Sequence, residues 1–177
     1  MLGHYQRKNT VTVLASLEQI QQAGIKVTEK NVYTGIRNVI TNTGLSGRWQ
    51  IVRRNPTVVC DTAHNADGIE QVLQQVSETP YKRLHLLLGF VNDKDIHEIL
   101  KYMPLKAVYY FTRLTVPRTM NENELAQAAL QYGLRGQTYG SVGEAFDAIE
   151  RNAENDDLIV ITGSNFLVAD FLENLEQ

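Results

Sequence analysis

An aspartate, a histidine and an asparagine stand close together where an apolar run ends. Residues 61–65 read Asp-Thr-Ala-His-Asn and follow the apolar run 56–60. Since helical spacing follows, the sequence places Asp61 and His64 where a buried strand ends and a helix begins. Open α/β sheets bind ligands at that edge, and the free N–H groups of a helix N-terminus favour anions. We therefore expect Asp61 and His64 to belong to a binding site.

Further loops carry polar residues after apolar runs. Lys94 lies in the loop after one run, Arg118 follows the next at Pro-Arg, and Ser164 follows the last at Gly-Ser. Parallel strands end at the same edge of a sheet, so these loops should gather there. Each residue also has a purely structural interpretation. Asp61 and Ser164 could simply be helix caps, and the others could be solvated surface residues. Their clustering favours a site.

The elements that must position these residues follow from the hydrophobic pattern. From Gly47 onward, short apolar runs alternate with longer amphipathic segments. This alternation predicts an α/β fold, a Rossmann-like, mostly parallel sheet with helices on both faces. The first two strands should be antiparallel neighbours or a bent pair. The expected strands are 49–53, 57–61, 83–90, 105–112, 136–139 and 157–162, and the expected helices are 65–76, 93–103, 121–132, 141–152 and 165–175.

Residues 1–44 differ from the rest because their pattern predicts only helices. Apolar residues recur at helical spacing on both sides of Gly24, which should end the first helix. Thr28 is the expected cap of the second helix, with Asn31 three residues on. Two amphipathic helices alone cannot bury both apolar faces. They need a partner surface, either in the rest of this chain or outside it.

Composition excludes several classes of protein. The 177 residues carry 17 basic and 20 acidic side chains, a net charge of −3, with no Lys/Arg block that would indicate a nucleic-acid partner. No apolar segment is long enough for a membrane span, and the N-terminus lacks the layout of a signal peptide. The single cysteine, Cys60, fits a reducing compartment and lies in an apolar run, so we interpret it as a core residue. We expect a cytoplasmic monomer.

Taken in order, the polar segments resemble the Mur ligase superfamily, and within it the folylpolyglutamate synthase/dihydrofolate synthase branch. Tyr5 stands where the family usually has His, and Thr62 stands where it usually has Gly, while Gln6 favours the folate branch. The segments that carry the resemblance are Gly3-His4-Tyr5-Gln6-Arg7-Lys8-Asn9 (G-x-H-Q-x-x-N), Gly44-Leu45-Ser46-Gly47-Arg48-Trp49 (the L-x-G-R-W-E linker), Asp61-Thr62-Ala63-His64-Asn65 (D-G-A-H-N), Asp93-Lys94-Asp95 (D-K-D), Pro117-Arg118 (P-R) and Gly163-Ser164 (G-S).

The chain has no G-x-x-G-K-[ST] phosphate loop. In the family, that loop and the residues that organise Mg²⁺ lie upstream, in a central ATPase domain. The resemblance therefore implies that residues 1–44 are the C-terminal helices of an incomplete central domain. It implies that residues 45–177 are the C-terminal, glutamate ligase domain. The partner surface of the helices would be the missing central domain, and this chain alone should be inactive.

The resemblance also implies a reaction. The family joins L-glutamate to a folate, and in many bacteria also to dihydropteroate. ATP, with Mg²⁺, phosphorylates the acceptor carboxylate, and the glutamate amine attacks the acyl phosphate. Arg48 should reach the ATP phosphates, because its fork is always charged. Asp61 should accept hydrogen bonds from the ribose or position the nucleotide.

The same resemblance assigns the substrate side. Lys94 and Ser164 should hold the incoming glutamate through its carboxylates, and Arg118 is a further candidate for substrate binding. His64 should lie near the glutamate and the acyl phosphate, where it orients the reactants together with Lys94. A lone His without a second ligand at metal spacing does not predict a metal site in this chain.

Two alternatives remain open at this point. The first is another Mur-type ligase that makes a murein precursor or a different amide, because substrate choice depends on upstream residues. The second is a stand-alone, non-catalytic module that binds a nucleotide or an amino acid. In that case the apolar face formed by Val11, Leu14, Val32 and Ile36 should pack on the chain's own sheet.

Overall fold

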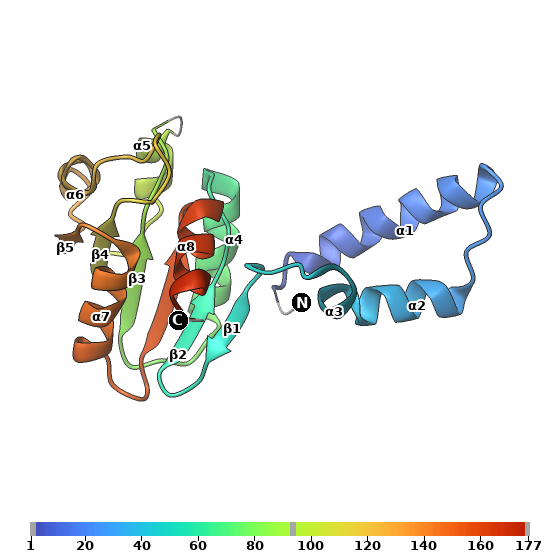
Figure 1. The fold of residues 1–177 in the computed structure, drawn as a ribbon, viewed down its shortest axis with the longest axis horizontal. Helices are drawn as coiled ribbons and strands as arrows, with labels where there is room; N and C mark the ends of the chain where they lie inside the picture. The colour runs from blue at the N-terminus through green and yellow to red at the C-terminus, as the bar shows by residue number, and fades with distance from the viewer. Residues whose placement is uncertain (1–2, 93–94, 176–177) are drawn as a thin grey trace.

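The computed structural model describes residues 3–92 and 95–175, and shows an α/β unit from which an N-terminal pair of helices extends (Figure 1). The strands are β1 (Gln50–Arg53), β2 (Thr57–Cys60), β3 (Leu84–Leu88), β4 (Val108–Thr112), β5 (Gly136–Tyr139) and β6 (Leu158–Thr162). The helices are α1 (Gln6–Gln22), α2 (Glu29–Arg37), α3 (Val39–Thr43), α4 (Ala66–Ser77), α5 (Ile96–Leu100), α6 (Glu122–Leu130), α7 (Val142–Asn152) and α8 (Asn165–Leu175).

The described strands form one sheet in the order β1-β2-β6-β3-β4-β5. β1 pairs antiparallel with β2, and every other neighbouring pair is parallel. The predicted mostly parallel sheet and the antiparallel first pair are therefore confirmed. Because β2, β6, β3 and β4 run the same way, their carboxyl ends share one edge, as the sequence analysis expected.

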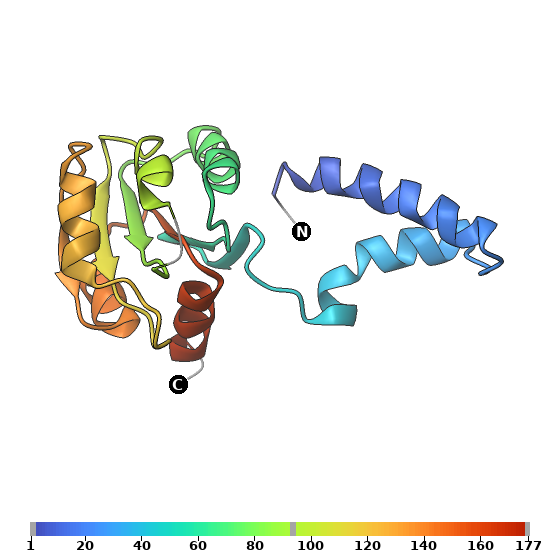
Figure 2. The ribbon, with the colours of Figure 1, turned by 90° about the horizontal axis from the view of Figure 1, so that it is seen from above.

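Helices cover both faces of the sheet, which explains why its central strands are buried throughout and mostly apolar. All residues of β3 and β6 are buried. One core cluster joins α4, α5 and α6 to the sheet, and the other joins α7 and α8 to the opposite face. Figure 2 shows α4 and α8 on opposite sides of the sheet. Cys60 is fully buried in β2, as expected of a core residue.

Several element boundaries differ from the expected ones. The expected strand 105–112 begins only at Val108, and Leu105 is 72% exposed. The expected helix 93–103 begins at Ile96, where Asp95 accepts a hydrogen bond from the Glu98 N–H and acts as the N-cap. Trp49 is not part of β1, because its positive φ of 46° interrupts the extended backbone there.

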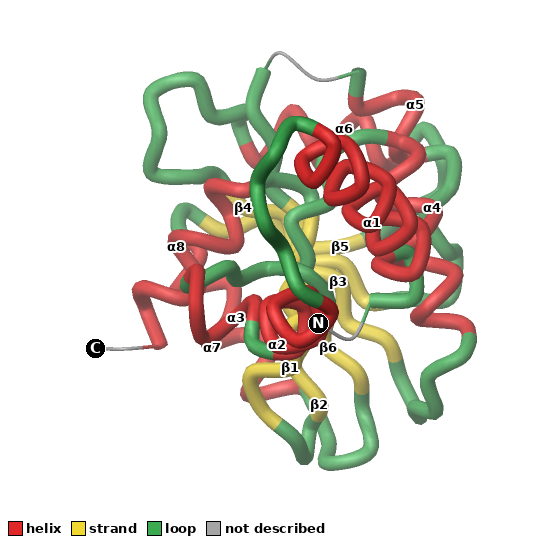
Figure 3. Tube along the Cα trace, turned by 90° about the vertical axis from the view of Figure 1, so that its right-hand side faces the viewer, coloured by secondary structure: helices red, strands yellow, loops and turns green. Residues whose placement is uncertain are grey.

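The N-terminal helices form as expected but bury none of their residues. Thr28 caps α2 in a reciprocal capping box with Asn31, and α1 ends just before Gly24, whose φ is +91°. Figure 3, seen from the helical end, shows α1 and α2 in front of the α/β unit. Val11 and Leu14 are 67% and 44% exposed. Among the described residues, no helix is long and apolar enough to span a membrane.

Candidate functional site

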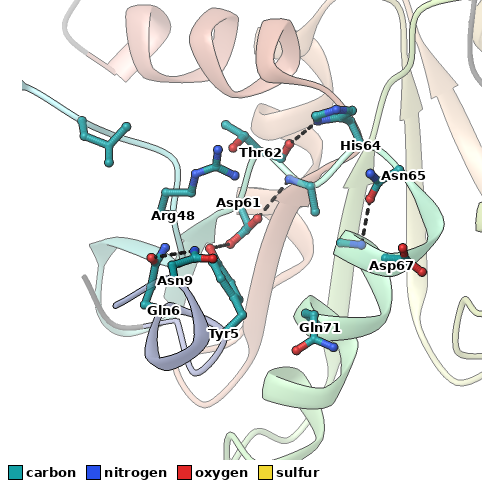
Figure 4. A pocket seen from close by; sticks show the side chains of 13 residues that line it. Tyr5, Gln6, Asn9, Arg48, Asp61, Thr62, His64, Asn65, Asp67 and Gln71 are labelled. Atoms are coloured by element: carbon teal, nitrogen blue, oxygen red, sulfur yellow. Dashed lines mark hydrogen bonds between the residues drawn. The ribbon is translucent and has the colours of Figure 1, made fainter. Parts of the chain in front are cut away.

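A cavity of about 500 Å³ lies at the carboxyl edge of the sheet, beside the end of β2 (Figure 4). Its walls are the start of α1, the linker before β1, and the loop from β2 into α4 with the first turn of that helix. Three of the residues predicted from sequence line it together: Arg48, Asp61 and His64. The sequence therefore placed these three side chains, which are distant along the chain, at one site.

Asp61 joins the three walls of this cavity. Its side chain is only 1% exposed. Oδ2 accepts hydrogen bonds from the Tyr5 hydroxyl at 2.7 Å and from the Trp49 N–H at 2.8 Å, and Oδ1 accepts from the Ala63 N–H at 3.0 Å. Burial raises the pKa of this carboxyl, while the three hydrogen bonds and the nearby Arg48 charge act in the opposite direction. Asp61 therefore organises the cavity as well as lining it.

Arg48 supplies positive charge to the cavity. Its side chain is exposed, and within residues 3–92 and 95–175 it has no hydrogen-bond or ion-pair partner. It follows Gly47, whose φ of +70° turns the linker and whose carbonyl accepts a hydrogen bond from the Thr62 N–H at 2.8 Å. A guanidinium held beside a cavity without a protein carboxylate partner is suited to bind a phosphate or carboxylate of a ligand.

His64 is half-buried and oriented by its own loop. Its Nδ1 lies 3.0 Å from the Thr62 carbonyl oxygen, which can only accept, so Nδ1 carries the proton. In the neutral ring, Nε2 is then an acceptor. Asn65 caps α4 by accepting from the Gly68 N–H at 2.8 Å. Asn65, and not Asp61, is therefore the N-cap of this helix, so the helix-cap interpretation that the sequence left open for Asp61 is wrong.

Ser164 and Arg118 lie outside this cavity. Ser164 is 3% exposed, and its hydroxyl accepts from the Phe166 N–H at 3.2 Å, so it caps the first turn of α8. The guanidinium of Arg118 lies 5.6 Å from the centroid of the Phe166 ring, at the same end of α8. The Gly163 N–H donates to the Ala63 carbonyl at 3.0 Å, which joins this loop to the cavity loop. Lys94 lies outside the described residues.

The sequence analysis assigned no role to the residues that α1 contributes. Tyr5, Gln6 and Asn9 line the cavity, and the Asn9 amide donates to Gln6 Oε1 at 3.0 Å. His4 fixes this end of α1 to α4, since its N–H donates to Gln75 Oε1 at 2.9 Å. The only signal for these residues was their match to G-x-H-Q-x-x-N, because hydrophobic periodicity cannot show which distant loop a helix start contacts.

The described residues hold no group of three or more His, Cys, Asp or Glu side chains that could bind a metal ion. The charged side chains that line the cavity are the guanidinium of Arg48 and the carboxylates of Asp61 and Asp67. Amide side chains of α1, the guanidinium of Arg48 and the N-terminus of α4 face a common space. Such a combination fits a ligand with polar edges and negative charge.

Comparison with known proteins gives the family. Residues 47–165 match the model described as "Mur ligase, glutamate ligase domain". The dihydrofolate synthase/folylpolyglutamate synthase of Escherichia coli is 31% identical over 172 residues, which are 95% of this chain and 38% of that protein. A diaminopimelate-adding ligase of UDP-N-acetylmuramoyl-L-alanyl-D-glutamate from Halalkalibacterium halodurans is 27% identical over 68% of this chain and 26% of that protein.

Solved structures give the same result. E. coli FolC in complex with DHPP and ADP superimposes with a TM-score of 0.81 and 29% identity, covering 95% of this chain and 38% of that one. Mycobacterium tuberculosis folylpolyglutamate synthase complexed with ADP and AMPPCP gives a TM-score of 0.80 and 28% identity, covering 98% and 40%. The chain thus spans about two fifths of these relatives. Its domain match shows that the chain belongs to the Mur ligase family, through the glutamate ligase domain.

Proposed function

We propose that this chain is the C-terminal part of an ATP-dependent ligase that adds L-glutamate to a folate through an acyl phosphate. The observation that carries the proposal is the cavity in which Arg48, which makes no hydrogen bond or ion pair with the described residues, lies beside Asp61 and the N-terminus of α4. Family membership supports the ligase chemistry. The resemblance to folylpolyglutamate and dihydrofolate synthases supports the folate as acceptor, with dihydropteroate as a second acceptor to be tested.

The cavity is the proposed nucleotide site. Arg48 binds a phosphate of ATP, because a guanidinium offers a bidentate and permanently charged donor. Asp61 positions the nucleotide by holding the walls, and its oxygens can accept a hydrogen bond from a ribose hydroxyl. Gln6 and Asn9 add amide donors and acceptors on the α1 side. Relatives solved with ADP support a nucleotide in this role.

The glutamate side of the reaction is assigned to the adjoining loops. Ser164 holds a glutamate carboxylate together with the free N–H groups at the start of α8, where the helix dipole favours an anion. Arg118 adds positive charge beside the start of α8, and Lys94 is assigned to the glutamate through the resemblance alone. His64, with Nε2 free to accept, orients the glutamate beside the acyl phosphate. These groups stabilise charge in a site that domain closure would shield from water.

Residues 1–44 are assigned to the end of a central ATPase domain and residues 45–177 to the C-terminal domain. The exposed apolar side chains of α1 and α2 support this division, since they would be covered by the remainder of the central domain. That upstream part supplies the phosphate loop and the Mg²⁺ ligands. On this proposal the isolated chain has no ligase activity, and ATP turnover by the purified chain would contradict it.

The test uses the complete gene product with three acceptors: a folate, dihydropteroate and a UDP-linked muramoyl peptide. We expect ATP-dependent incorporation of L-glutamate into the folate. Incorporation of an amino acid only into the UDP-linked acceptor would replace the proposal with its murein alternative, which the Halalkalibacterium relative represents. The folate branch is favoured because its E. coli member matches 95% of this chain rather than 68%.

The stand-alone binding module is the less favoured alternative. It required the face of Val11, Leu14, Val32 and Ile36 to pack on the chain's own sheet. Instead α1 and α2 contain no buried residue, and Ile36 is 39% exposed. These helices lie away from the sheet, as Figure 1 shows.

A further inference from the structure

We propose that Tyr5 is a positioning residue for the nucleotide cavity, acting through Asp61. The phenol does not need to touch the ligand for this role. It ties the start of α1 to the same carboxylate that holds the linker and the β2–α4 loop. The inference rests on the proposed function in one respect, namely that the cavity binds a nucleotide.

The contact is short, specific and long-range. The Tyr5 hydroxyl donates to Asp61 Oδ2 at 2.7 Å, although 56 residues separate the two along the chain. The same oxygen accepts from the Trp49 N–H at 2.8 Å. Hydrogen bonds to an ionised acceptor are stronger than those between neutral groups. The three walls of the cavity are therefore joined at the Asp61 carboxylate. Tyr5 provides the contact between this carboxylate and the start of α1 (Figure 4).

The position of Gly3 fits this role. A Cβ atom built on Gly3 would lie 2.6 Å from Cε1 and 2.8 Å from Cζ of the Tyr5 ring, closer than atoms can approach. The ring thus lies against the Gly3 backbone, and any side chain at position 3 must push the phenol away from Asp61. A glycine here leaves the space that the tyrosine needs to reach the carboxylate.

The consequence for the ligand follows from the geometry of α1. Gln6 and Asn9 lie within the next turn of the helix and line the cavity. If the Tyr5 hydroxyl is lost, the start of α1 keeps the hydrogen bond from the His4 N–H to Gln75, but loses its connection to the cavity floor. The two amide side chains then sample more positions, and ordering them on binding costs conformational entropy.

The experiment compares Tyr5→Phe with Tyr33→Phe, in the complete gene product for ADP binding and in the 177-residue chain for tryptophan fluorescence. Tyr33 lies on α2, is 66% exposed and is absent from the cavity walls, so it controls for loss of a phenol hydroxyl. ADP binding is measured by calorimetry. We expect about three- to tenfold weaker binding for Tyr5→Phe, as for loss of one positioning hydrogen bond. We expect no change for Tyr33→Phe.

The single tryptophan of the chain, Trp49, gives a second readout. Trp49 is 4% exposed, and its backbone N–H donates to Asp61 Oδ2, the oxygen that also accepts from the Tyr5 hydroxyl. If the contact between Tyr5 and Asp61 is lost, acrylamide should quench Trp49 fluorescence more strongly in Tyr5→Phe than in the wild type. Quenching should be unchanged in Tyr33→Phe. Gly3→Ala, which keeps the hydroxyl but displaces the ring, should reproduce both effects.

The outcomes separate the two proposals. If the complete wild-type protein does not bind ADP, the nucleotide assignment fails, and Trp49 quenching in the 177-residue chain still tests the Tyr5 junction. If the wild type binds ADP and Tyr5→Phe binds equally well or more tightly, the positioning role of Tyr5 is wrong. Unchanged Trp49 quenching in both Tyr5→Phe and Gly3→Ala would also overturn it.

Discussion

The backbone of Gly47 lies directly against the side chain of Thr62. The Gly47 carbonyl accepts a hydrogen bond from the Thr62 N–H at 2.8 Å, and a Cβ atom on Gly47 would lie 2.5 Å from Thr62 Cγ2. Gly47 also has a φ of +70°, which L side chains rarely adopt. The linker that carries Arg48 can approach the β2–α4 loop this closely only because position 47 has no side chain.

Gly44→Ala is a matched control for Gly47→Ala. Gly44 has a φ of +66°, but a Cβ atom there would meet nothing within 4 Å. We expect Gly44→Ala to cost about 1 kcal/mol of unfolding free energy, the strain of the left-handed conformation alone. Gly47→Ala should cost about 1–3 kcal/mol more because of the steric overlap. Urea denaturation measures both, and adding Thr62→Ser to Gly47→Ala should recover part of the loss. Equal losses in the two single variants would show that the close approach is not maintained.

Replacement of Asp61 should reduce stability as well as ligand binding. The structure shows three donors satisfied by this buried carboxylate. Leaving them without a partner should cost about 2–4 kcal/mol. Asp67→Ala, an exposed acid lining the same cavity, should change unfolding free energy by less than about 0.5 kcal/mol. A similar stability for both variants in urea would contradict the organising role of Asp61.

A buried His85–Asp157 contact should make stability depend on pH. His85 Nε2 lies 3.2 Å from Asp157 Oδ2, and the Tyr110 hydroxyl lies 3.2 Å from Nδ1. Burial lowers the pKa of His85, and the contact with Asp157 only partly opposes this. The folded state therefore prefers neutral His85. Its contribution to stability is complete above the unfolded pKa of about 6.5 and is lost as pH falls below that value toward the folded pKa.

Asp157 should act in a lower pH range. Although burial raises the pKa of this carboxyl, hydrogen bonds from the Glu154 N–H, His85 and Arg83 bring it below its ordinary value. Its contribution is present above about pH 3.9 and is lost as pH falls through the folded pKa. Urea denaturation from pH 7.5 to pH 5 covers the range of His85 and lies above that of Asp157. His85→Gln should flatten that part of the curve, whereas His97→Gln, an exposed histidine, should leave its slope unchanged. If the unfolding free energy of His85→Gln still falls with pH as in the wild type, another titrating group causes the pH dependence.

The exposed face of α1 should contribute little to the stability of this chain. Val11 and Leu14 are both largely exposed, so the double change Val11→Ser and Leu14→Ser should lower the unfolding free energy of the α/β unit by less than about 0.5 kcal/mol. Leu87→Ala, in the fully buried β3, should cost about 2–5 kcal/mol. In the complete gene product, the double change should become strongly destabilising, because the proposed central domain would cover these residues. Equal, small effects in both proteins would contradict the proposal that the central domain covers Val11 and Leu14.

The periodicity of the sequence predicted the α/β class and the elements because the central strands are mostly apolar and alternate with amphipathic helices. β3 and β6 are buried on both faces, which leaves little ambiguity. Chain topology then places Asp61 and Ser164 on the same edge, since both follow parallel strands. The start of β4 was predicted too early because Leu105 is apolar yet exposed, and periodicity cannot distinguish an exposed leucine from a buried one.

The finer geometry of the site depends on contacts that periodicity does not encode. Tyr5 and Asp61 meet across 56 residues, and only a family resemblance marked Tyr5 as notable. Ser164 and Arg118 lie at the start of α8 and not in the cavity with Arg48, although their loops follow β6 and β4 at the same edge of the sheet. Which loops share a cavity is set by loop length and side-chain packing, which the pattern of apolar residues does not specify.

The central claim is tested most directly by incorporation of labelled L-glutamate by the complete gene product, in the wild type and in Arg48→Ala. Arg135→Ala, an exposed arginine far along the sheet, is the control. The wild type and the control should add glutamate to a folate only when ATP is present. Arg48→Ala should be slower by about 10²-fold or more, as for loss of a charge on the transferring phosphoryl group, with unchanged urea stability. Absence of glutamate addition by the wild type, or a wild-type rate for Arg48→Ala, would contradict the account.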